Sequence, residues 1–131
     1  MEQTSSEIFC QFIYDESFTY DELLQIEENL ISSIEDLLHR SGAEHIDFTP
    51  LGDTLMLQCA YSEHKIYIFR KLACKLAELL PPKISGRVVC LSHALDACQV
   101  YWLKHNEWQE QNIPLPETPP EGLRSWKAGE E

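Results

Sequence analysis

The sequence has few of the residues from which common catalytic and cofactor-binding motifs are built. Its five glycines are widely spaced, so it contains no glycine-rich phosphate loop and no dinucleotide-binding fingerprint. No two cysteines have the CxxC spacing, and GxSxG, HExxH and EF-hand patterns are absent. We therefore expect no cofactor, and no familiar class of enzyme is indicated.

Long uncharged stretches and positive charges are also scarce. The longest run without Asp, Glu, Lys, Arg or His is nine residues, 54–62, whereas a membrane-spanning helix needs roughly 18. Ten Lys and Arg stand against 22 Asp and Glu, which gives a net charge of −12. A general nucleic-acid binder needs clustered positive charge. We therefore expect neither a membrane nor a nucleic acid as a partner.

The cysteines and the N-terminal residues bear on the compartment. The five cysteines are an odd number and lack the compact spacing of a disulfide framework, which fits reduced thiols better than a secreted domain. The first residues do not show a basic segment followed by a long apolar one, the pattern of a secretory signal. We expect a cytoplasmic protein.

The pattern of apolar residues predicts a single α+β domain over residues 1–105. Short runs of β-branched and aromatic residues predict strands, and apolar residues three and four apart predict two helices. A capping box at Thr19 and Glu22 predicts the start of the first helix, and Gly42 predicts its end. In chain order the predicted elements are a strand at 8–14, a helix at 20–41, strands at 45–49 and 54–61, a helix at 64–80, and strands at 87–91 and 98–103.

This order is that of a ferredoxin-like split β-α-β sandwich. Such a fold has a mostly antiparallel sheet with both helices on one face, here followed by an extra C-terminal strand. Residues 106–131 carry four of the seven prolines and are predicted to form an irregular tail.

The sheet face turned away from the helices is predicted to be apolar. Strand alternation places Phe9, Ile13 and Met56 on that face, and an exposed apolar patch usually marks an interface or is covered by another part of the chain. The tail, which contains Trp108 and Trp126, is one candidate cover. A second copy of the chain is the other, and the sequence does not decide between them.

Positive charge is concentrated in the second predicted helix, at Lys65, Arg70, Lys71 and Lys75. These side chains either keep the outer face of the helix in water or meet an acidic surface. The acidic surface could belong to the same chain or to a partner.

Cys90, His93 and Cys98 are the closest group of soft metal ligands, and Asp96 lies in the same stretch. Two thiolates and an imidazole suit zinc, but a structural zinc site needs a fourth ligand. Buried cysteines also serve as small apolar residues in strands. We predict no metal site here and keep these residues as the candidates should one exist.

Three hypotheses about function follow from these observations. The first is a small protein-interaction or regulatory module without catalytic activity, which binds another protein or a second copy of itself. Its predicted contact residues are Phe9, Ile13, Met56, Lys65, Arg70, Lys71, Lys75, Trp108 and Trp126. The alternative is a small-molecule or metal-binding domain, with or without enzymatic activity, that uses the Cys90, His93, Asp96 and Cys98 group at the sheet end. The net charge alone also suggests an acidic inhibitor that imitates nucleic acid.

Overall fold

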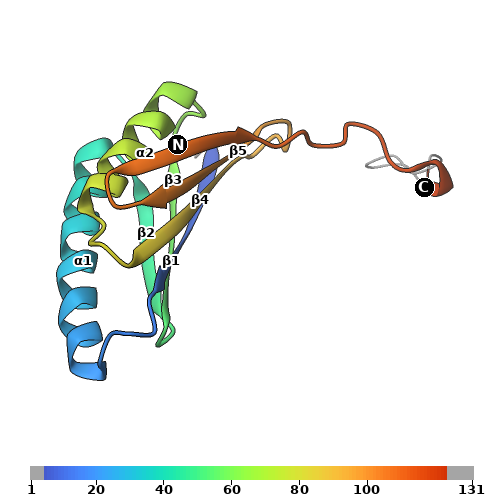
Figure 1. Cartoon of the computed structure of the whole chain (residues 1–131). Coiled ribbons are helices and arrows are strands. Elements are labelled where there is room, and N and C mark those ends of the chain that lie inside the picture. Colours follow the sequence, from blue (N-terminus) through green and yellow to red (C-terminus); the bar gives the residue numbers. More distant parts are fainter. Residues whose placement is uncertain (1–4, 124–131) are drawn as a thin grey trace.

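Two helices cover one face of a six-stranded antiparallel sheet (Figure 1). The computed structural model describes residues 5–123. The elements are β1 (Ser6–Tyr14), α1 (Tyr20–Ser41), β2 (Glu44–Pro50), β3 (Thr54–Tyr61), α2 (Ile66–Leu79), β4 (Ile84–Ser92), β5 (Cys98–Lys104), β6 (Glu107–Asn112) and a short 3-10 helix, η1 (Glu121–Leu123). The strand order is β2-β3-β1-β4-β5-β6. The first four strands and both helices follow the ferredoxin-like plan, so the predicted fold class is confirmed.

Helix α1 begins and ends at the predicted signals. The side chain of Thr19 accepts a hydrogen bond from the backbone N–H of Glu22, and the Glu22 carboxylate accepts one from the backbone N–H of Thr19. Gly42 ends the helix at φ 89°, a left-handed conformation that glycine adopts without steric cost. The helix buries Leu30, Ile34 and Leu38 against the sheet.

Helix α2 is held by packing more than by capping. Its N-cap residue, Lys65, makes no side-chain capping hydrogen bond, so burial of one apolar face supplies its stability. The buried residues of this face are Phe69, Leu72, Ala73, Leu76 and Ala77. The helix lies over β5 and β6, and prolines 81 and 82 follow it directly, where a helix cannot continue.

Strand β1 lies between β3 and β4 and shows how the two sheet faces differ. Ile8, Cys10 and Phe12 are buried beneath the helices, whereas Phe9 and Ile13 point to the other face and stay partly exposed. Because side chains alternate along a strand, one segment supplies both the core and the open face.

Strand β4 begins earlier than predicted and includes Gly86. A Cβ atom on Gly86 would lie 2.9 Å from the ring of Phe12, which is fully buried. A residue without a side chain lets the two strands pair at this point without displacing that ring. The strand predicted from the β-branched run at 87–91 did not include Gly86.

Strand β6 was not predicted. Its sequence is polar, but its side chains alternate between the two sheet faces. On the helix side, Trp108 packs against the core and Glu110 accepts a hydrogen bond from the Tyr101 hydroxyl. A tight turn leads into it, with Asn106 at φ 60°, a conformation that asparagine tolerates. The sheet therefore continues to Asn112, past the predicted boundary at residue 105.

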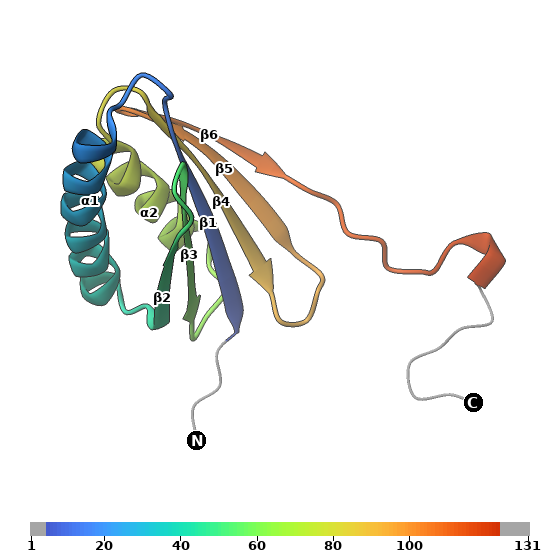
Figure 2. The same ribbon diagram turned by 90° about the horizontal axis from the view of Figure 1, so that it is seen from below.

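The chain after β6 leaves the edge of the sheet and runs away from it in both views (Figures 1 and 2). Residues 113–123 therefore do not lie across the open face of the sheet. For the described part of the tail, the hypothesis that it covers this face is wrong. Extended backbone is what the prolines at 114, 116, 119 and 120 favour.

Candidate functional site

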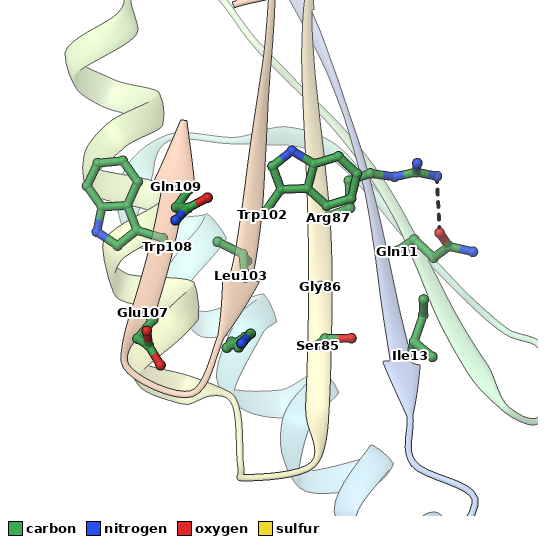
Figure 3. A pocket seen from close by; sticks show the side chains of 11 residues that line it. Gln11, Ile13, Ser85, Gly86, Arg87, Trp102, Leu103, Glu107, Trp108 and Gln109 are labelled. Carbon is green, nitrogen blue, oxygen red and sulfur yellow. Dashed lines mark hydrogen bonds between the residues drawn. The ribbon is translucent and has the colours of Figure 1, made fainter. Parts of the chain in front are cut away.

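A hollow of about 400 Å³ lies over β1, β4, β5 and β6 (Figure 3). We call it the open-face hollow because its exposed side chains project from the side of the sheet that carries no helix. It is lined by Gln11, Ile13, Ser85, Gly86, Arg87, Trp102, Leu103, Lys104, Glu107, Trp108 and Gln109. Its volume is within the range of small-molecule sites.

Arg87 occupies the middle of this region. Figure 3 shows its side chain reaching from β4 toward β1, where Nη2 donates a hydrogen bond of 3.2 Å to Oε1 of Gln11. The guanidinium carbon lies 5.6 Å from the centre of the Trp102 ring, within the range of a cation–π contact. Strand register explains the contacts, since Gln11, Arg87 and Trp102 lie opposite one another on β1, β4 and β5.

Trp102 is anchored at its polar end. The indole Nε1 donates a hydrogen bond of 3.1 Å to Oε1 of Gln111 on β6. The side chain is nevertheless 46% exposed. The indole nitrogen has a partner, and apolar ring surface remains in contact with solvent.

Arg87 differs from the other two arginines between residues 5 and 123, because no carboxylate neutralises its charge. The structure describes three arginines; Arg40 pairs with Asp36 at 3.2 Å and Arg70 pairs with Glu110 at 2.8 Å. Within residues 5–123 no carboxylate forms an ion pair with Arg87, whose one hydrogen-bond partner is a neutral amide.

The predicted basic surface of α2 is mostly paired within the chain. Arg70 makes two hydrogen bonds to Glu110, Lys65 lies 3.2 Å from Glu63, and Lys75 lies 3.8 Å from Glu78. Hydrogen bonding to Arg70 holds the pKa of Glu110 below its ordinary value. Lys71 and Lys75 also line a second hollow, of about 650 Å³, between α1 and α2.

The candidate metal ligands are not brought together. Cys90 is fully buried on the helix side of β4, and burial raises the pKa of its thiol. Cys98 lies opposite Leu91 in the register and therefore points to the other face of the sheet. His93 lies 3.2 Å from Glu7, and Asp96 accepts a hydrogen bond from Ser92. No group of three potential metal ligands occurs in the described part of the chain.

The predicted contact residues are dispersed. Phe9, Ile13 and Met56 do share the open face, and Ile13 lines the hollow. Trp108 packs on the helix side, with its ring 5.9 Å from that of Tyr101. Trp126 lies outside the described residues. Whether any of these residues contacts a partner stays a prediction.

Sequence reasoning missed three residues of this region: Arg87 and Trp102, which line the hollow, and Gln111, which accepts the hydrogen bond of Trp102. The alternation of β4 already placed Arg87 opposite the core, since the buried Val88 is next to it. Gln111 could not be found, because it is positioned by a strand that the sequence did not predict. The signal available in the sequence was the pair Arg87 and Trp102, a cation and an indole at outward-facing positions of two consecutive predicted strands.

Comparisons with known proteins give little further guidance. No protein-family model matches the chain, and no curated protein sequence matches it. Among solved structures, the chain is similar to one described as the adenylyl cyclase CyaB from P. aeruginosa, with 11% identity and a TM-score of 0.42. The match covers 85% of this chain and 67% of that one.

This match corrects one expectation. The solved structure is that of an enzyme, so it does not support the prediction of a module without catalytic activity, and we withdraw that prediction. At this low similarity the match does not assign the cyclase activity to the chain.

No helix among residues 5–123 has the length and apolar character needed to cross a membrane.

Proposed function

We propose that the chain binds a small anionic molecule in the open-face hollow, with Arg87 as its principal contact. The observation that carries this proposal is the state of Arg87. It is a cation at the centre of an exposed sheet face, and in a chain of net charge −12 its partner is an amide instead of a carboxylate. Binding of this kind serves an enzyme as well as a regulatory protein.

The chemistry of the side chain fits an oxyanion. A guanidinium group has five N–H donors in a planar fork that matches the two oxygens of a carboxylate or a phosphate. Gln11 uses one nitrogen, Nη2, of Arg87. Donors therefore remain for a ligand, and Gln11 holds the group in place.

The other charged residues of the hollow leave it locally positive. Lys104 and Glu107 both line it and lie opposite each other in the register of β5 and β6. Two cations and one carboxylate give a local charge of +1. The acidic residues elsewhere act only weakly, because the Debye length at physiological ionic strength is about 8 Å.

The experiment is a ligand titration followed by NMR. Acetate, inorganic phosphate and benzoate are added in turn to the 15N-labelled chain, and the indole N–H signal of Trp102 is followed after assignment with Trp102→Phe. We expect saturable shifts, at least a tenfold weaker affinity in Arg87→Gln, and unchanged affinity in the control Arg40→Gln. Absence of saturable binding by every anion, or equal loss in both variants, would contradict the proposal.

Self-association and a cytoplasmic location stay predictions. A second copy over Phe9, Ile13 and Met56 would also cover the open-face hollow. Self-association through this face and ligand binding would therefore exclude each other. Sedimentation of the same samples with and without ligand separates them. Competition between ligand and self-association would indicate a shared surface.

A further inference from the structure

We propose that the ligand of the open-face hollow carries a flat aromatic ring, which stacks on the indole of Trp102 while its acidic group binds Arg87. This inference rests on the proposed function and specifies the chemical class of the ligand. It follows from how Trp102 and its neighbours are held.

The indole offers an apolar surface whose orientation is favoured by one hydrogen bond. Its N–H is already bonded to Gln111, so the ring has no polar group left to satisfy. This hydrogen bond also restrains rotation of the side chain. Nearly half of the residue is exposed, and an aromatic ring is the partner that makes best use of a flat π surface.

The distance between the two contact groups suits a single compact molecule. The guanidinium carbon of Arg87 is 5.6 Å from the ring centre of Trp102, so one small molecule can place an aromatic ring against the indole and an attached acidic group beside the cation. A simple ion such as phosphate would use Arg87 alone and leave the indole in water.

The neighbouring side chains favour the same ligand. Ile13 lines the hollow and is 47% exposed, so it gives apolar contact to the edge of a ring. Gln109 lies opposite Trp102 in the register and also lines the hollow. The site thus joins one aromatic, one aliphatic and one cationic contact, whereas a binder of bare anions needs only the last.

The test compares two acids that differ in flatness. Benzoate and cyclohexanecarboxylate have the same charge and nearly the same size, but only benzoate has an aromatic ring. We expect the wild-type chain to bind benzoate about fivefold more tightly, measured by NMR titration, because offset stacking adds to ordinary apolar contact. In Trp102→Leu the difference should vanish, and Trp102→Phe should restore part of it.

The outcomes separate this inference from the proposed function. If both acids bind equally well and Trp102→Leu leaves that unchanged, the ring is not recognised, while the anion site stands. If neither acid nor phosphate binds, the proposed function fails and this inference fails with it. Equal loss of both acids in Trp102→Leu, with an unchanged unfolding midpoint, also contradicts stacking, because it indicates a contact that does not depend on the ligand's ring. Arg87→Gln should weaken both acids to the same extent.

Discussion

The same strands form both faces of the sheet, but the helices cover only one of them. On the helix-covered face the buried tyrosine hydroxyls have partners: the Tyr14 hydroxyl donates to Glu27 and the Tyr101 hydroxyl donates to Glu110. On the open face, Phe9 and Ile13 stay partly exposed, and Arg87 has no carboxylate partner among the described residues. Packing of the core explains the residues on the helix-covered face. It does not explain why apolar residues and an arginine without a carboxylate partner occupy the open face.

The difference has an energetic meaning. Full burial of a large apolar side chain contributes about 1.5–3 kcal/mol. The chain leaves much of this contribution unused at Phe9, Ile13 and Trp102, which are 39%, 47% and 46% exposed. A surface that does not maximise folding stability is where binding residues are expected.

The largest expected effect on stability comes from substituting Phe12 of β1, with Phe9 of the same strand as its comparison. Phe12→Ala should lower the free energy of unfolding by about 3–5 kcal/mol, because it empties a fully buried position. Phe9→Ala, on the other face of the same strand, should cost about 1 kcal/mol or less. Urea denaturation of both variants measures the contrast. Similar losses would mean that the faces do not differ in stability as we argue.

Gly86→Ala should have the next largest effect. The new Cβ would approach the Phe12 ring to 2.9 Å, and crowding of this kind costs about 1–3 kcal/mol. Gly122→Ala is the control, because nothing lies within 4 Å of a Cβ there. In a Phe12→Leu background the cost of Gly86→Ala should shrink. An undiminished cost would place its origin elsewhere than in the ring.

A smaller effect is expected where β6 meets α2. The pKa of Glu110 is lowered in the folded chain, first by hydrogen bonding to Arg70. A lowered pKa stabilises the fold above the ordinary glutamate value of about 4.3 and ceases to do so as the pH falls through the folded-state value. Glu110→Gln should therefore cost about 1 kcal/mol at pH 7, since Arg70 is half-exposed and screened, and progressively less as the pH falls below the ordinary glutamate value.

Denaturation curves at several pH values test this dependence, with Glu117→Gln in the tail as the control. A cost that stays constant from pH 7 to pH 3 would show that shape at residue 110 matters and charge does not.

Periodic signals predicted the helix-covered face well. The capping box at Thr19 and Glu22, and the alternation of β1, are local features, and the structure has them where the sequence indicates. Such features are readable because each depends on residues close together in the chain.

Residues that act through distant neighbours were not predictable in this way. Gly86 is explained only by Phe12 of another strand, and β6 only by the contacts of Trp108 and Glu110 with α2 and β5. The open-face hollow depends on β6, because Gln111 anchors Trp102. The sequence predicts an open sheet face, but not which of its residues form a site.

The smallest effect on stability should accompany the clearest effect on binding. Arg87→Gln removes a charge from an exposed side chain whose one hydrogen bond is to an amide and whose contact with the Trp102 ring is exposed, so we expect the unfolding free energy to change by less than about 1 kcal/mol. Arg70→Gln breaks a two-bond contact to Glu110 and should cost more stability, with no loss of anion binding. Denaturation and NMR titration of both variants give four values. If Arg87 served the fold as Arg70 does, the two variants would lose similar stability; a separation of the effects would show that the two faces of one sheet have different tasks.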